Sequence, residues 1–339
     1  MIAFNLIQPQ VRKIALFLSI ALSTCAFSQQ APPAAEQDQQ DQPLETLRVN
    51  VNVVNLYFNV KDKHGHLIPD LTKDDFLISE DGKPQTVKYF SKESDQPLTL
   101  GMLIDTSGSQ QMVLGIEQSV GAQFLQQVLR PKDLAFLINF DVNVELDQDF
   151  TNNGQQLRRA LNDVKINRGG GGAIGIPGIG QGPFPTSNPR GTLLYDAIFL
   201  AADEKLKSEV GRKAMIILTD GEDQGSQERI EGAIESAQKS DAICYVLLIE
   251  DRGMYNGFGA GLMKKLAEQT GGRVIEVGNK PEKLRDALDQ ISNELRTQYF
   301  IGYASTNQKR DGTYRKVEVK TKSSDYKIQA RKGYYAPNK

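Results

Sequence analysis

One stretch of the sequence decides the fold that we expect: Leu103-Ile104-Asp105-Thr106-Ser107-Gly108-Ser109, which follows an apolar run that begins at Thr99. The pattern D-x-S-x-S places one carboxylate and two hydroxyls directly after a buried strand, on a turn that Gly108 makes tight. Oxygen ligands suit a hard cation such as Mg²⁺, which also keeps some water or partner ligands. The stretch therefore predicts a cation site at a strand end.

Two further segments carry polar residues at corresponding places. In Gly191-Thr192-Leu193-Leu194-Tyr195-Asp196-Ala197, a threonine stands at the start of an amphipathic helix. In Met215-Ile216-Ile217-Leu218-Thr219-Asp220-Gly221, a second buried strand ends in a carboxylate and a glycine. Ligands of open α/β sheets bind outside the carboxyl ends of the strands. Asp105 and Asp220 are therefore expected to lie at one edge of a sheet.

From Thr99 onward, continuous apolar strands alternate with amphipathic helices. The expected strands are residues 99–104, 135–140, 213–219, 242–249 and 273–277. Apolar stripes at helical spacing begin at Val113, Leu194 and Leu284, and Pro281 stands at the first turn of the last of these helices. This alternation predicts an α/β fold with a doubly wound, mostly parallel sheet covered on both faces.

The order D-x-S-x-S, G-T and T-D-G resembles the von Willebrand factor A (VWFA) family and its metal-ion-dependent adhesion site, over about residues 99–295. The resemblance implies that two serines, a threonine and two aspartates hold Mg²⁺ (or Mn²⁺ or Ca²⁺), directly or through water. One position of the cation stays open for the carboxylate of a protein partner. The implied metal ligands are Asp105, Ser107, Ser109, Thr192 and Asp220. Because Gln110 and Gln111 replace the acidic residues of integrin β subunits, we expect a single metal.

The segments before and after this region have the pattern of β structure. Residues 47–60 alternate between apolar and polar, and Asp81-Gly82 and Arg310-Asp311-Gly312-Thr313 both have the sequence of hairpin turns. Each segment has only three or four strands, and so few strands are marginally stable without a second face to pack against. We therefore expect both flanks to form one small β-sandwich into which the α/β domain is inserted.

The arrangement resembles the hybrid domain that carries the inserted A-type domain of integrin β subunits. It also resembles VWFA-related proteins of Acidobacteria, through Asp75-Phe76-Leu77-Ile78-Ser79-Glu80-Asp81-Gly82 and the ending Arg331-Lys332-Gly333-Tyr334-Tyr335. The domains that we expect are a signal peptide (1–28), a disordered linker (29–46), the first part of the sandwich (47–96), a von Willebrand factor A domain (97–296) and the second part of the sandwich (297–336).

The N-terminus has the pattern of a secretory signal. Arg12 and Lys13 precede an apolar core at residues 14–22, which is too short for a permanent transmembrane helix, and small residues allow cleavage after Ser28. Leu22-Ser23-Thr24-Cys25 offers a second interpretation, a lipobox with a lipid anchor at Cys25. Either interpretation predicts export to the periplasm or the outside, with no transmembrane helix in the mature chain. Cys244, in an apolar run, is expected to be a buried small hydrophobe.

The segment at residues 168–190 departs from the A-domain pattern, because it is rich in glycine and proline. A phosphate-binding loop is excluded, since the G-K-[ST] ending is absent. The segment directly precedes Thr192, so it is expected to emerge near the metal. A flap over the binding site and a passive linker both remain open.

The composition limits the function classes. The chain has 40 basic and 42 acidic residues, which speaks against a nucleic-acid partner. Its two histidines, His64 and His66, both lie in a turn-like stretch, so a histidine-based catalytic triad is not expected. We expect a secreted or periplasmic binding module without catalytic residues, whose partner is an acidic residue of another protein. Two alternatives stay open. One is a metal-assisted hydrolase with Asp105 as nucleophile, although Ser107 stands where haloacid-dehalogenase phosphatases have their second aspartate. The other is a metal-free scaffold.

Overall fold

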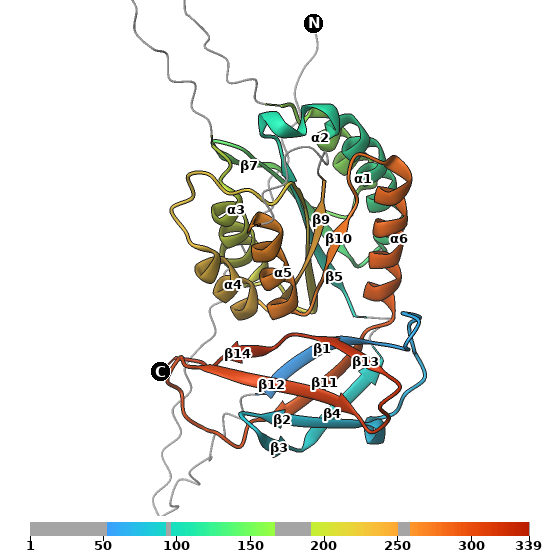
Figure 1. Ribbon diagram of the computed structural model, residues 1–339, viewed down its shortest axis with the longest axis vertical. Helices are drawn as coiled ribbons and strands as arrows, with labels where there is room; N and C mark the ends of the chain where they lie inside the picture. Colours follow the sequence, from blue (N-terminus) through green and yellow to red (C-terminus); the bar gives the residue numbers. More distant parts are fainter. Residues whose placement is uncertain (1–52, 93–95, 167–190, 250–257, 339) are drawn as a thin grey trace, which may run out of the picture. The chain divides into compact units, whose positions relative to one another are not determined.

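The structure is a computed structural model that describes residues 53–92, 96–166, 191–249 and 258–338 (Figure 1). The predicted signal peptide and linker, Cys25 and the glycine-rich segment at 169–189 all lie outside these residues. Within the described ranges, no helix combines the length and the apolar character needed to cross a membrane.

A six-stranded sheet forms the centre of the α/β domain, in the order β10-β9-β8-β5-β6-β7. Five strands are parallel: β5 (Leu98–Asp105), β6 (Leu134–Phe140), β8 (Arg212–Thr219), β9 (Ala242–Leu248) and β10 (Val274–Glu276). The sixth strand, β7 (Val144–Thr151), runs antiparallel to β6 at the edge. All eight residues of β5 are buried, as expected for a central strand covered on both faces.

Helices cover both faces of this sheet (Figure 1). One face packs against α1 (Leu114–Val128), α2 (Gly154–Asp163) and α6 (Pro281–Arg296). The other face packs against α3 (Leu194–Leu200), its π-helical continuation (Ala201–Leu206), α4 (Ile230–Lys239) and α5 (Phe258–Thr270). Alternate residues of β5 enter the two cores, Met102 on the first face and Leu103 on the second. The doubly wound α/β fold predicted from the sequence is confirmed.

The two flanks of the chain form two four-stranded antiparallel sheets. The first has the order β13-β1-β11-β4 and combines β1 (Val53–Lys61), β4 (Val87–Lys92), β11 (Tyr299–Ala304) and β13 (Lys327–Ala330). The second has the order β14-β12-β2-β3 and combines β2 (Phe76–Glu80), β3 (Lys83–Gln85), β12 (Tyr314–Thr321) and β14 (Gly333–Tyr335). Each sheet contains strands from both flanks, so the predicted sandwich with its inserted α/β domain is confirmed.

Aromatic side chains join the two sheets of the sandwich. Phe58 of the first sheet meets Phe76 of the second edge to face, with ring centroids 5.1 Å apart. Tyr299 stacks on Phe58 at 5.7 Å and donates its hydroxyl to Ile68 O at 2.7 Å. Aromatic pairs with this spacing add packing energy beyond the area that they bury.

The two turns with hairpin sequences have different outcomes. Asp81 and Gly82 have φ values of 47° and 78° and connect β2 to its antiparallel neighbour β3, which is the expected hairpin. Residues 310–313 also form a turn, with Gly312 at φ 66°, but the hairpin prediction is wrong there. The strands on its two sides, β11 and β12, belong to different sheets. A turn sequence fixes the local backbone, whereas the choice of sheet depends on distant partners such as β1 and β2.

Candidate functional site

The predicted site lies where two neighbouring parallel strands end. Asp105 is the last residue of β5, and Asp220 directly follows Thr219, the last residue of β8. The strands pair from Leu98–Arg212 to Ile104–Leu218, so their carboxyl ends meet at one edge of the sheet. After β5 the chain turns through Ser107 into a short 3₁₀ turn, Gly108–Met112, and then into α1. The end of the strand and the start of the helix therefore hold the D-x-S-x-S pattern between them.

Four of the five predicted residues are joined by hydrogen bonds. Ser107 N donates to Asp105 Oδ1 at 3.0 Å, and the hydroxyls of Ser107 and Ser109 lie 2.9 Å apart. Ser109 Oγ donates to Asp220 Oδ2 at 2.6 Å. The chain of contacts runs from one strand end to the other and brings two carboxylates and two hydroxyls to one place.

Thr192 lies at the same edge but is not part of this chain of contacts. Its backbone exchanges two hydrogen bonds of 2.9 Å with Gln224, in the loop after β8. The next amide, Leu193 N, donates to Asp141 O at 2.7 Å, in the loop after β6. Thr192 is buried, and within the described residues no hydrogen bond links its hydroxyl to the other four predicted ligands. The structure thus places Thr192 between the loops that follow β6 and β8.

Asp141 fixes these loops relative to the serine turn. Its carboxylate accepts from Asn143 N at 2.9 Å and from Thr106 Oγ1 at 3.3 Å, while its carbonyl accepts from Leu193 N. Asp141 is itself buried. One aspartate therefore connects the residue between Asp105 and Ser107 to the segment that presents Thr192.

The electrostatics of the site favour a cation. Asp105 is fully buried, and this burial raises its pKa to about 7, with a further contribution from the negative charge of Asp220. Hydrogen bonds from Ser107 and Thr219 lower the pKa and offset part of that rise. A buried carboxylate that a neighbouring carboxylate repels is stabilised by a proton or by a positive ion.

Glu117 is a third carboxylate of this region, which the sequence analysis missed. It lies in the first turn of α1, is 1% exposed, and neither of its carboxylate oxygens has a hydrogen-bond partner among the described residues. Burial raises its pKa to about 8, and the charges of Asp105 and Asp220 raise it further. The signal was present in the sequence, because Glu117 follows Val113 and precedes Val120 on the apolar stripe of the helix, where a charge is out of place.

The residues present suit Mg²⁺ or Mn²⁺. All candidate ligands are carboxylate or hydroxyl oxygens, which hard cations prefer over sulfur or imidazole. Buried Gln110 adds an amide oxygen that has no partner in the described part of the chain, and its Nε2 lies 3.5 Å from Ser109 Oγ. No group of three or more His, Cys, Asp or Glu side chains placed to hold a metal occurs in the described part of the chain. A cation here would therefore depend on the hydroxyls as well as on the two aspartates.

Comparison with known proteins gives similar folds but no family. No family model matches the sequence. No curated protein matches it either. The similar solved structures include the conserved hypothetical protein BatB from Bacteroides thetaiotaomicron, at 18% identity and a TM-score of 0.43, covering 58% of this chain and 98% of that one. The vWF domain of the type V pili tip protein Mfa5 from Porphyromonas gingivalis has 12% identity and a TM-score of 0.42, covering 58% and 94%. The VWA domain of SpRpn10 has 12% identity and a TM-score of 0.39, covering 57% and 94%.

Proposed function

We propose that this protein is an exported binding module of the von Willebrand factor A type, whose Mg²⁺ or Mn²⁺ bridges it to a carboxylate of a protein partner. One observation carries the proposal: Asp105 and Asp220, at the ends of neighbouring strands, are linked through the hydroxyls of Ser107 and Ser109. Such a cluster supplies hard oxygen ligands and negative charge on one side of an ion. The export component depends on the predicted N-terminal signal.

Each residue would have a defined part in holding the cation. Ser107 and Ser109 would turn their hydroxyl lone pairs toward the ion, and Thr192 would approach from the neighbouring loop. Asp220 and Asp105 would supply negative charge, directly or through bound water. Ordered water ligands are common for Mg²⁺, and a partner's carboxylate that replaces one of them would complete the coordination.

A nucleophilic role for Asp105 is disfavoured by its surroundings. The side chain is fully buried, and both carboxylate oxygens accept hydrogen bonds, Oδ1 from Ser107 N and Oδ2 from Thr219 Oγ1. A nucleophile must reach its substrate directly, which the burial of Asp105 opposes, whereas its charge can still act on a cation through bound water. We therefore assign no catalytic residue, and a metal-free scaffold is the main alternative that an experiment has to distinguish.

Calorimetry of the full chain tests the metal. After treatment with chelator and its removal, MgCl₂ or MnCl₂ should bind at one site per chain. Asp220→Asn should abolish this binding, because the variant loses a charge and a ligand oxygen. Glu222→Gln is the matched control: it makes the same charge change two residues away, on an exposed side chain whose carboxylate contacts Gln224. Absence of saturable binding, or equal loss in both variants, would favour the metal-free scaffold.

A second experiment tests the partner. The tagged chain should recover a protein from the native envelope in the presence of Mg²⁺, and lose it with EDTA. The Asp220→Asn variant should fail to recover that protein in Mg²⁺, while Glu222→Gln should still recover it. Recovery that is the same in all four conditions would contradict a metal-bridged contact.

A further inference from the structure

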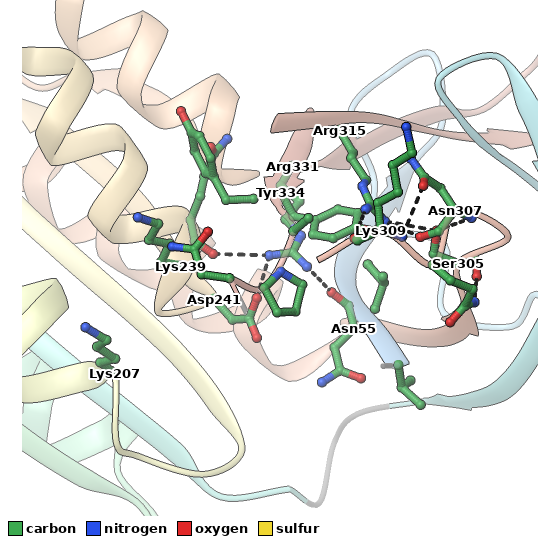
Figure 2. A pocket seen from close by; sticks show the side chains of 18 residues that line it. Asn55, Lys207, Lys239, Asp241, Ser305, Asn307, Lys309, Arg315, Arg331 and Tyr334 are labelled. Atoms are coloured by element: carbon green, nitrogen blue, oxygen red, sulfur yellow. Dashed lines mark hydrogen bonds and ion pairs between the residues drawn. The ribbon is translucent and has the colours of Figure 1, made fainter. Parts of the chain in front are cut away.

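A second candidate site lies away from the strand ends, where the sandwich meets the α/β domain. A cavity of about 440 Å³ opens between the end of α4, the start of β1 and the strands β12 and β14. Figure 2 shows the side chains that line it. Small-molecule sites in proteins have volumes of about 300–1,000 Å³, so the cavity has room for a small ligand.

Positive charge dominates the lining of this cavity. Asp241 is the single acidic residue among the lining residues. The basic residues are Lys207, Lys239, Lys309, Arg315 and Arg331. A concave surface of one sign of charge concentrates ions of the opposite sign. The lining therefore favours an anion.

Two of these cations are held in place by the fold. Arg331 is 9% exposed and donates to Asp241 Oδ1 and to Asn55 O, which lie on opposite sides of it in Figure 2. Arg315 is 3% exposed and donates to the carbonyls of Asn307 and Lys309. The carbons at the centre of both guanidinium groups lie within 6 Å of the Tyr334 ring centroid, at 5.8 Å and 5.9 Å. Each guanidinium also has a carboxylate beside it: Asp241 pairs with Arg331, and buried Glu80 lies 3.7 Å from Arg315 Nη1. The two arginines are thus fixed in place, and their charge is largely balanced.

The lysines provide charge that a ligand can reach. Lys309 is exposed, and it forms no ion pair within the described part of the chain. Lys239 and Lys207 pair with Glu235 and Asp203 at i, i+4 spacing on partly exposed helix surfaces. Such pairs contribute only about 0.3–0.5 kcal/mol, so an anion in the cavity can compete with these carboxylates for the ammonium groups.

We propose that this cavity binds a small molecule through an oxyanion, a phosphate or carboxylate group. Lys309 and Lys239 contact the oxyanion, and Arg315 and Arg331 form the rigid wall behind it. Charge-assisted hydrogen bonds from ammonium groups to oxyanions are among the stronger polar contacts in proteins. The site is separate from Asp105 and Asp220 and needs no metal.

Titration of the full chain with two probes tests this proposal. Inorganic phosphate and citrate are titrated separately by calorimetry, at constant ionic strength, into protein from which metal has been removed by chelator and the chelator by dialysis, so that a bound cation plays no part. We expect saturable binding with one site per chain. Tighter binding of phosphate identifies a phosphoryl ligand, and tighter binding of citrate identifies a carboxylate ligand.

Variants then locate the site. The double variant Lys239→Ala/Lys309→Ala should weaken binding of the tighter probe by about tenfold or more. Lys322→Ala, an exposed lysine of the sandwich that does not line the cavity, should leave the affinity unchanged. Both substituted lysines are exposed, so the fold should survive. Lack of saturable binding by either probe, or equal affinity of the double variant and the wild type, would overturn the proposal.

Discussion

Thr219 Oγ1 donates a hydrogen bond to Asp105 Oδ2 at 2.7 Å, across the ends of two neighbouring strands. The same hydroxyl accepts from Gly221 N at 3.0 Å and so also shapes the turn after β8. With Ser107 N on the other oxygen, Asp105 has both of its carboxylate oxygens fixed. A residue that is not itself a predicted ligand thereby sets the orientation of a predicted ligand.

Substitution of Thr219 by valine should therefore disturb the site without a large change in volume. The variant leaves Asp105 Oδ2 and Gly221 N without this partner in a buried place, and we expect a loss of about 1–3 kcal/mol in the free energy of unfolding. Urea denaturation in EDTA measures this loss. Thr99→Val is the matched control, because Thr99 is also buried and its hydroxyl makes no hydrogen bond to the described residues. Equal stability of the two variants would contradict this role of Thr219.

The raised pKa values predict how the metal-free protein responds to pH. Burial raises the pKa of Asp105 from its ordinary value of 3.8 to about 7, and that of Glu117 from 4.5 to about 8. Between these values, the folded state holds protons that the unfolded state has lost. The stabilisation is therefore complete below about pH 4 and is lost as the pH rises through 7 to 8.

Thermal unfolding in EDTA at pH 5.5 and pH 8 checks this dependence. The wild type should have the lower Tm at pH 8, and Glu117→Gln should reduce the difference, because glutamine carries no titrating charge. Glu282→Gln, on an exposed position of α6, is the control and should keep the difference of the wild type. If Glu117→Gln and the wild type show the same Tm difference between pH 5.5 and pH 8, ionisation of Glu117 is not the cause of the pH dependence.

A buried ion cluster connects the two domains and can be tested in the same way. Glu294 of α6 accepts from Lys61 Nζ of β1 and from Arg273 Nε, both at 2.8 Å, and its side chain is 3% exposed. Glu294→Gln leaves Lys61 and Arg273, whose side chains are 19% and 26% exposed, without their carboxylate. Because solvent reaches both cations, we expect a loss of about 1–3 kcal/mol in the free energy of unfolding. Urea unfolding should show this loss, whereas Glu282→Gln in the same helix should not. A loss below that of the control would mean that the cluster contributes nothing to stability.

Alanine substitutions at two glycines should change the stability of the protein in opposite directions. A Cβ added at Gly272 would lie 1.9 Å from the carbonyl oxygen of Cys244, a backbone atom of the central sheet that cannot move aside. Gly272→Ala should therefore prevent folding or lower the Tm sharply. Gly115, in the first turn of α1, has no atom within 4 Å of such a Cβ. Gly115→Ala should stabilise the protein by up to about 1 kcal/mol, since alanine favours the helix. Thermal unfolding of both variants distinguishes the two effects.

The parallel strands could be predicted from the sequence because each is a continuous apolar run, and such a run indicates a buried strand by itself. The edge strand β7 could not, because its residues, Val144–Thr151, include five polar or charged side chains and alternate poorly. Solvent covers one side of an edge strand, so burial does not select an apolar pattern there. A local pattern also does not predict which sheet β4 or β12 joins. Each strand is placed by an antiparallel partner far along the chain, β11 for β4 and β2 for β12.

The candidate site shows the same division between local and distant information. Asp105, Ser107 and Ser109 lie within one turn of chain, and Asp220 follows an unmistakable buried strand, so their meeting follows from the parallel pairing of β5 and β8. The place of Thr192 depends on tertiary contacts with Asp141 and Gln224. Glu117 stands on an apolar helical stripe, but only the tertiary structure shows that this position faces the two aspartates at the strand ends.

The insertion of the α/β domain also orders the assembly of the chain. The chain leaves the sandwich after β4 and returns through α6 into β11, which pairs directly with β4. While the α/β domain is unfolded, this pairing requires closure of a very long loop, and loop closure costs entropy. Once that domain has folded, its two ends are held close together and the remaining closure is short. The first sheet of the sandwich should therefore form after the α/β domain in refolding, because the folded α/β domain holds β4 and β11 close enough to pair.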